Sequence, residues 1–326
     1  MGLCNSKSIA RKTSTKQQFF NPVDSYQSTR SMLHHEHKKS TKGSKPKNKS
    51  SAKELRRSDT QNSCNDDMRN ESCIDLYEME HKILKDVWQG NFGCDIREEL
   101  QTEQKHILDV ACGPGHWIRD MKNEFPKSHI IGIQASPCHK IKLTPDIAIL
   151  RMDIVSGLSY GNDSFDYVHM SCLSSSFSEN DWKIAISEMV RVTKPQGIVE
   201  IVVGSCDCED SGPIMKKLCD SRRAFLGMNG IEVDISKGLE NLMRNTQKFD
   251  SLEKQTRKIP IGKSGTIGEM YQSYFTLIME SYRDPLSSYL GQSPQEFDET
   301  LNSLNTELDR FKNSNFHSVR IIGKKH

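Results

Sequence analysis

Apolar residues recur at helical spacing just before the first strongly hydrophobic run of this 326-residue chain. They stand at Leu76, Met79, Ile83, Leu84 and Val87. Such spacing places apolar side chains along one stripe of a helix, so the pattern predicts an amphipathic helix over 74–88. Gly90 follows the last of them, and glycine is common where helices end. The folded part of the chain is therefore expected to begin near residue 73.

Five short apolar runs follow, separated by stretches of helical periodicity. They read HILDVA, HIIGIQ, IAILRMD, FDYVHM and GIVEIVV, and they begin at residues 106, 129, 147, 165 and 197. Apolar strands that alternate with helices are typical of a mostly parallel sheet covered on both faces. KPQG, residues 194–197, predicts a type I turn before the fifth strand. Beyond residue 210 the pattern is mainly helical, with strands expected near 247–260 and 315–322, and the sequence predicts one domain over 73–326.

The charge of the chain is divided unevenly. Residues 1–60 hold 14 Lys and Arg against 4 Asp and Glu, a net charge of +10, whereas the remainder holds 31 against 39, a net charge of −8. Residues 1–72 are rich in Ser, Lys, Asn, Thr and Gln and poor in aliphatic residues, so they cannot bury enough apolar surface to offset the entropy of ordering. The composition predicts a disordered basic tail over 1–72.

The first residues of this tail, MGLCNSK, match a lipidation pattern. Gly2 and Ser6 stand where N-myristoylation motifs require them, and Cys4 is a candidate palmitoylation site. One acyl chain holds a membrane only marginally, so Cys4 or the basic run HKKSTKGSKPKNKS would supply the second signal. The expected location is cytoplasmic with peripheral membrane association. Two alternatives stay open, an ordinary solvated tail and a nuclear import or nucleic-acid patch, although short lysine runs alone are no strong signal for nucleic acid.

The ten cysteines show no Cys-x-x-Cys pair, and no secretory signal is evident. This usage is typical of reduced thiols inside a cell. Cys206, Cys208 and Cys219 have no histidine near them at ligand spacing, so we expect small buried side chains there and no metal.

The candidate chemistry follows the first apolar run, in ILDVACGPGHW, residues 107–117. Gly113 and Gly115 would let a ligand approach the backbone closely, and the helix after them would offer free N–H groups. A dinucleotide site would need a third glycine where Ile118 stands, and the carboxylate of Asp109 would repel a pyrophosphate. S-adenosylmethionine carries an ammonium group and a sulfonium but no phosphate, so the motif favours that ligand.

The second apolar run ends on Gln134, where a nucleoside-binding strand usually has Asp or Glu to accept from both ribose hydroxyls. Glutamine has the reach of Glu and keeps one acceptor oxygen, but it carries no charge. We therefore expect a cofactor that is retained and held by an amide.

Taken with their order and spacing, these motifs resemble a known family. Residues from about 74 to the end are similar to class I, Rossmann-like S-adenosylmethionine-dependent methyltransferases. YEMEHKILKDVWQGNF, ILDVACGPGHW, SFDYVHM and EMVRVTKPQGIVEIVV resemble the fungal methyltransferase-domain proteins related to LaeA, regulators of secondary metabolism. The resemblance implies a doubly wound α/β fold with a seven-stranded sheet in the order 3-2-1-4-5-7-6, the last strand antiparallel, and helices on both faces.

The resemblance also implies a set of cofactor-binding residues. Asp109 and the loop Ala111, Cys112, Gly113 and Gly115 would hold the methionine part, and Gln134 would face the ribose. Asp153 would accept from the adenine amino group, and Ile154 would donate its backbone N–H. His169 and Met170 would line the floor near the reactive methyl group, with His169 the one candidate for a catalytic base. The departures from the family pattern are Ala111, in place of the usual first glycine, and Gln134.

The sequence thus predicts an S-adenosylmethionine-dependent methyltransferase whose acceptor, a protein or a small molecule, stays open. Two alternatives belong to other classes. A regulatory scaffold would bind the cofactor or partners without turnover. An NADP-dependent oxidoreductase would use His139 or Lys140 for the 2′-phosphate, and Asp109 and Ile118 speak against it.

Overall fold

The computed structural model describes residues 76–135, 147–172 and 177–326. The predicted tail over 1–72, with its lipidation motif, lies outside the described residues, as do His139 and Lys140. The expected first helix is present over 76–88, the part of it that is described. Within the described ranges, no helix is both long enough and apolar enough to span a membrane.

The described residues build one seven-stranded sheet with the order β3-β2-β1-β4-β5-β7-β6. The strands β1 to β5 run parallel to one another, and β7 runs antiparallel to both β5 and β6. The implied order and the antiparallel strand are therefore confirmed. The strands are β1 (His106–Val110), β2 (His129–Gln134), β3 (Ala148–Arg151), β4 (Phe165–Cys172), β5 (Thr193–Gly204), β6 (Phe249–Pro260) and β7 (Asn315–Lys325).

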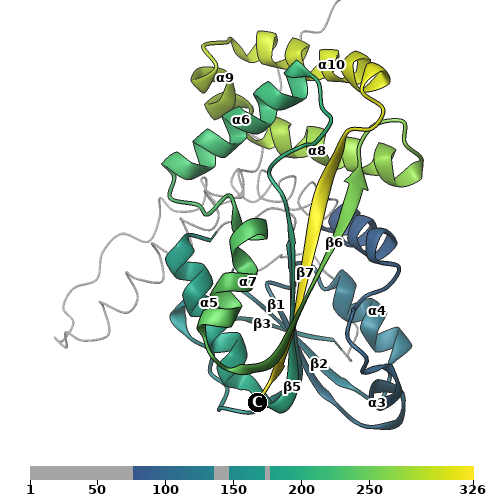
Figure 1. The fold of residues 1–326 in the computed structure, drawn as a ribbon, viewed down its shortest axis with the longest axis vertical. Helices are drawn as coiled ribbons and strands as arrows, with labels where there is room; N and C mark the ends of the chain where they lie inside the picture. Colours follow the sequence, from purple (N-terminus) through teal and green to yellow (C-terminus); the bar gives the residue numbers. More distant parts are fainter. Residues whose placement is uncertain (1–75, 136–146, 173–176) are drawn as a thin grey trace, which may run out of the picture.

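Helices cover both faces of the sheet and one of its ends (Figure 1). α5 and α7 lie against one face, α4 and the helix 76–88 lie against the other, and α6, α8, α9 and α10 gather beyond the far ends of β6 and β7. The helices are α3 (Arg97–Thr102), α4 (His116–Glu124), α5 (Glu179–Val192), α6 (Pro213–Met228), α7 (Ile235–Asn245), α8 (Thr266–Ser281), α9 (Arg283–Tyr289) and α10 (Pro294–Arg310), with a 3-10 turn, η1, at Ile154–Ser156.

Local side chains fix where two of these helices begin. Ser178 and Asp181 form a capping box at α5, and Ser293 forms another with Glu296 at α10, where Pro294 occupies the first turn. Each box satisfies N–H groups that a helix start leaves without a partner. α6 begins at a glycine, which has no capping side chain. The carboxylate of Glu307 on α10 instead accepts hydrogen bonds from two of the first N–H groups of α6, each at 2.7 Å.

The expected type I turn at residues 194–197 is wrong. The segment lies inside β5, in an irregularity of the β4–β5 register. Gln196 has φ +62°, and a positive φ at the third position belongs to type II turns, which proline at the second position also favours. Pro195 is compatible with both turn types, so the sequence does not separate them.

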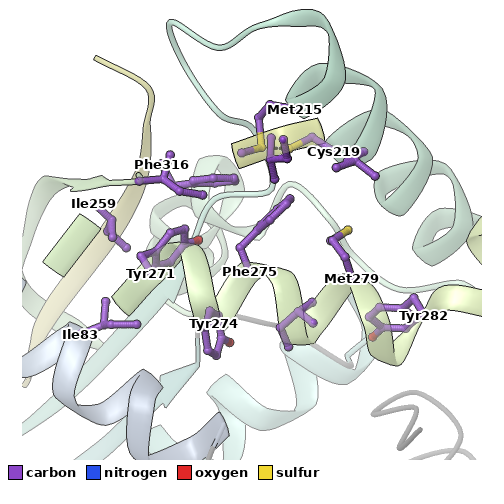
Figure 2. Packing of buried hydrophobic residues seen from close by; sticks show 14 of the residues in the cluster. Ile83, Met215, Cys219, Ile259, Tyr271, Tyr274, Phe275, Met279, Tyr282 and Phe316 are labelled. Carbon is purple, nitrogen blue, oxygen red and sulfur yellow. Dashed lines mark hydrogen bonds between the residues drawn. The ribbon is translucent and has the colours of Figure 1, made fainter. Parts of the chain in front are cut away.

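The helices beyond the sheet end enclose an aromatic core of their own (Figure 2). Tyr271, Tyr274 and Phe275 of α8 pack with Phe316 of β7, and Tyr271 and Phe275 have ring centroids 5.1 and 5.6 Å from that of Phe316. Ile83 of the helix 76–88 joins the same core. This core packs the helix 76–88 against α8. The packing determines which side chains of that helix face the carboxyl ends of the strands.

Candidate functional site

The loop between β1 and α4 has three residues in the left-handed region. Ala111 has φ +56°, Gly113 +52° and Gly115 +82°. Gly115 is also the N-cap of α4, and no side chain caps that end of the helix. The first N–H groups of α4 can therefore bind an anionic group of a ligand. Ala111, the departure from the family pattern, is exposed and adopts the strained angle that glycine would adopt freely.

Tyr77, which the sequence analysis did not single out, covers this loop. A Cβ atom placed on Gly113 would lie 2.8 Å from the Tyr77 ring, so the loop and the helix 76–88 nearly touch. That helix is held on α4 by Asp120, whose carboxylate lies 3.0 Å from His81 Nε2 and 2.6 Å from Lys85 Nζ. The sequence places Tyr77 at the start of the predicted amphipathic helix. Nothing local in the sequence indicates that Tyr77 contacts Gly113.

The close packing of α4 on the sheet depends on a glycine of β2. Ile118 is fully buried, and a Cβ atom on Gly132 would overlap its Cδ1 atom and the Cys112 sulfur. A dinucleotide-binding fold places the small residue on the helix; here Ile118 stands on the helix and Gly132 on the neighbouring strand. This exchange explains why the missing third glycine does not disturb the helix–strand contact.

Asp109 is buried directly before the loop. It is 2% exposed, and its Oδ1 lies 2.8 Å from Nδ1 of His169, its register partner on β4. The His169 ring is 1% exposed and stacks on Trp117 of α4, with centroids 4.0 Å apart and an interplanar angle of 6°. Burial raises the pKa of the Asp109 carboxyl, and the contact with His169 opposes that shift. The structure therefore brings Asp109 and His169 together beneath α4.

His169 and Met170 do not line one surface. Successive strand residues point to opposite faces, and Met170, 2% exposed, packs in the core beneath α5. β4 continues past both residues to Cys172.

Backbone hydrogen bonds join the first residues after β1 and after β3 to the end of β2. The Cys112 N–H donates to the Ile133 carbonyl at 3.1 Å, and the Met152 N–H donates to the Gln134 carbonyl at 3.0 Å. Gln134 thus lies half-buried at the carboxyl end of β2, one strand from the glycine loop. These contacts bring the residues proposed to bind the methionine, ribose and adenine parts of the cofactor to the carboxyl end of the sheet.

Asp153 caps the 3-10 turn that follows β3. Its Oδ1 accepts from the Val155 N–H, and its Oδ2 accepts from the Ser156 hydroxyl, each at 3.0 Å. Ile154 is 4% exposed and packs in the α5-side core. The carboxylate has further lone pairs for a ligand amino group, because an ionised Asp can accept about four hydrogen bonds.

His116 is a second residue that the sequence analysis missed. It opens α4 directly after the glycine loop, and its Nδ1 lies 3.1 Å from an Arg119 guanidinium nitrogen. Its Nε2 is buried and has no hydrogen-bond partner among the described residues. Burial lowers the pKa of His116, which favours the neutral ring.

These features fit S-adenosylmethionine. The glycine loop and the open α4 end can take its carboxylate, and Asp109, when ionised, would be a counter-charge for its ammonium. The missing side chain of Gly113 leaves room for the Tyr77 ring, which packs directly on the loop. The buried Nε2 of His116 gives the site a further polar atom without a protein partner among the described residues.

Parts of this sequence are similar to known proteins. Residues 107–197 match the family described as "Methyltransferase domain". The chain is 25% identical over 254 residues to the secondary metabolism regulator laeA of Coprinopsis cinerea, and 24% identical over 155 residues to the N-methyltransferase verN of Clonostachys rogersoniana. These alignments cover 69% and 44% of this chain. It spans 60% and 51% of the lengths of those two relatives.

A solved structure also matches part of this chain. Phosphoethanolamine N-methyltransferase 2 of Haemonchus contortus, in complex with S-adenosyl-L-methionine, matches with a TM-score of 0.48 and 15% identity. The match covers 79% of this chain and 57% of that one.

Proposed function

We propose that this chain, which carries a class I, Rossmann-like S-adenosylmethionine-dependent methyltransferase domain resembling that of LaeA, transfers a methyl group to an acceptor. The observation that carries the proposal is the loop of Gly113 and Gly115, which lies beneath Tyr77 and opens onto an uncapped helix end beside the buried Asp109. S-adenosylmethionine, when bound, supplies a methyl carbon activated by its sulfonium.

The binding residues implied by the sequence are kept as part of the proposal. Asp109 would attract the ammonium, and the loop at Gly113 with the α4 N–H groups would hold the carboxylate. Gln134 would face the ribose. Asp153 and the Ile154 N–H would take the adenine edge. The chain's own contribution is positioning and the exclusion of water by Tyr77 and the helix that carries it.

For His169 we propose a positioning role. Its ring lies between Trp117 and Asp109 and is 1% exposed, so it is well placed to fix the carboxylate rather than to reach an acceptor. A base that acts on the acceptor must lie within hydrogen-bond reach of it. His169 would hold Asp109 in the orientation that meets the ammonium.

The decisive test is calorimetry of the full chain with S-adenosylmethionine, S-adenosylhomocysteine and NADPH, followed by methyl transfer from radiolabelled S-adenosylmethionine into extract of its own cells. We expect binding of the first two ligands, no binding of NADPH, and label in protein or small molecules. Binding without label would favour the scaffold, the alternative that the name of the laeA relative, a regulator, also suggests. Binding of NADPH would favour the oxidoreductase.

We also propose that the basic tail associates the domain with the cytoplasmic surface of a membrane. Gly2, Cys4 and the lysine run support this proposal, because an acyl chain with a second signal gives stable anchoring. Gly2→Ala should move the protein from the membrane to the supernatant on fractionation of native cells. Identical fractionation of the wild type and the variant would refute the anchor, and nuclear retention of both would support the import hypothesis.

A further inference from the structure

Glu80 and Tyr274 form a polar contact between two helices that close the carboxyl end of the sheet. Tyr274 Oη donates to Glu80 Oε2 at 2.8 Å across 194 residues of sequence. The tyrosine is 4% exposed and lies in the aromatic core of α8, and Glu80 is half-buried. Figure 2 shows Tyr274 leaving α8 on the side of the helix that carries Ile83, which is the helix of Glu80. A carboxylate is thus held in place by a buried hydroxyl.

The position of Glu80 relative to the glycine loop follows from its helix. Residues three apart on a helix are neighbours on its surface, and Glu80 is three residues after Tyr77. Tyr77 covers Gly113, whose missing Cβ atom would lie 2.8 Å from the tyrosine ring. Glu80 therefore lies one helical turn from Tyr77, the residue that covers the loop proposed to bind the methionine part of the cofactor.

β4 ends at the same end of the sheet as the glycine loop. β4 pairs with β1, so Cys172 at the end of β4 lies one strand from the glycine loop after β1. Burial raises the pKa of the Cys172 thiol, and the negative charge of Glu80 adds to that shift. Ligands of parallel α/β sheets bind at such strand ends.

From this arrangement we propose that Glu80, held by Tyr274, forms the acceptor side of the site and selects an amine as the methyl acceptor. The inference rests on the methyltransferase function proposed above. An amine nitrogen gains positive charge as it bonds to the methyl carbon, and a fixed carboxylate stabilises that charge. An anionic nucleophile, such as a carboxylate or thiolate, would be repelled by Glu80. A free hydroxyl would need a stronger base, because an ordinary Glu has a pKa of about 4.3.

The transfer balances with the groups named. The nitrogen lone pair forms the N–C bond while the C–S bond breaks, and its electron pair stays on sulfur as a neutral thioether. The methylated nitrogen keeps its positive charge beside the Glu80 carboxylate and gives up a proton to water after release. No oxidant, reductant or metal is needed.

The first test measures binding and needs no acceptor. Calorimetry with S-adenosylmethionine and S-adenosylhomocysteine compares the full-length wild type with Glu80→Gln and with Glu78→Gln, a control on the same helix whose partner is the exposed Lys82. Only the first ligand carries the sulfonium charge. We expect Glu80→Gln to weaken S-adenosylmethionine on the order of tenfold while S-adenosylhomocysteine changes little. Glu78→Gln should leave both affinities unchanged.

If Glu80→Gln binds both ligands as tightly as the wild type, Glu80 does not lie beside the methyl group. An equal loss of affinity for both ligands would overturn that placement as well. A wild type that binds neither ligand would instead refute the methyltransferase function itself. Tyr274→Phe removes the hydroxyl that holds Glu80 and should show the same selective loss in weaker form. Tyr289→Phe, at a half-exposed tyrosine, is its control.

The second test identifies the acceptor chemistry. The full chain is incubated with S-adenosylmethionine tritiated in its methyl group and with extract of its own cells, and the products are treated with mild base. An N-methyl product keeps its label and binds a cation exchanger, which would support the proposal. Release of the label as volatile methanol would reveal a methyl ester, and base-stable label in a neutral ether would reveal a hydroxyl acceptor. Either of those results would overturn it.

Discussion

The face of the sheet beneath α4 and the helix 76–88 carries two buried carboxylates with different partners. Asp109 on β1 meets the His169 imidazole, and Glu200 on β5, which is fully buried, meets the Arg320 guanidinium with Oε1 and Nε 3.0 Å apart. The two carboxylates lie in one row, because His169 is the register partner of both Asp109 and Glu200. They are separated only by β4.

Their surroundings show that the two carboxylates serve different purposes. Glu200 also accepts from the Gly93 N–H with both oxygens, at 3.0 and 3.1 Å, and Arg320 lies 4.2 Å from the centroid of the Trp88 ring. These contacts bind the segment after the helix 76–88 to the sheet. Asp109 instead precedes the loop that the ligand would meet. We therefore assign Glu200 to the fold and Asp109 to the proposed site.

The test with the largest expected effect removes Glu200, the carboxylate assigned to the fold. Glu200→Ala leaves Arg320 charged and buried without its counter-charge, and breaking a buried pair in this way costs about 3–5 kcal/mol. We expect that loss in the free energy of unfolding measured with urea. Glu253→Ala is the matched control, since Glu253 lies in the same row of the sheet but is exposed, and it should change stability by less than about 0.5 kcal/mol.

A double variant separates the charge from the packing. Glu200→Leu combined with Arg320→Met replaces both charges by apolar groups and should recover most of the stability. If Glu200→Ala unfolds no more easily than Glu253→Ala, Glu200 does not anchor the fold.

The largest effect on the site region is expected at the glycine loop. Gly113→Val introduces a branched side chain at φ +52°, where a Cβ atom would already meet Tyr77 at 2.8 Å. We expect loss of S-adenosylmethionine binding by more than about 100-fold, which is about 2.7 kcal/mol. Gly230→Val is the control, because Gly230 has φ +75° with nothing within 4 Å of an added Cβ atom.

Both valine variants should lose stability by about 1–2 kcal/mol from the left-handed backbone. Only Gly113→Val should lose the ligand in calorimetry. Undiminished affinity in folded Gly113→Val would remove this loop from the site.

The local parts of this architecture could be predicted from the sequence. The strands, the glycine loop and Asp109 each stand within a short segment whose periodicity or spacing is readable. Strand pairing order came from the family resemblance. The glycine that makes room for Ile118 could not be located, because Gly132 lies on another element and looks like any strand residue.

The long-range contacts could not be predicted for a physical reason. Glu200 stands inside the apolar run GIVEIVV, and its partner Arg320 lies 120 residues later on an antiparallel strand. Tyr274 and Glu80 are likewise far apart in sequence. Periodicity reports which face of an element is buried, but it carries no information about which residue will lie opposite.

A smaller effect is expected when the site carboxylate is neutralised. Asp109→Asn keeps the shape but removes the counter-charge of the ammonium, and S-adenosylmethionine should bind roughly tenfold more weakly, a loss of about 1.4 kcal/mol. The stability of the variant should also depend on pH in a different way. Burial raises the pKa of Asp109 in the folded protein above its unfolded value.

The sign of that dependence is fixed by linkage. A raised folded pKa gives the wild type stability that is fully present below the unfolded value of about 3.9 and is lost as pH rises through the folded value. The amide that replaces the carboxyl in Asp109→Asn does not titrate. The variant should therefore gain stability relative to wild type as pH rises from about 4 toward neutrality, measured by urea unfolding. A constant difference across that range would show that Asp109 has an ordinary pKa.

The smallest expected effect lies at Gln134, at the far side of the site region. The amide has one acceptor oxygen and no charge, so it forfeits on the order of 1–2 kcal/mol against a carboxylate that accepts from ribose hydroxyls. Gln134→Glu should therefore tighten S-adenosylmethionine severalfold in calorimetry and leave NADPH unbound. Adenosine should gain affinity in the same variant, whereas 2′,3′-dideoxyadenosine, which lacks both hydroxyls, should not. Weaker binding of S-adenosylmethionine by the variant would show that the ribose does not meet residue 134, and the site would then be confined to Asp109 and the glycine loop.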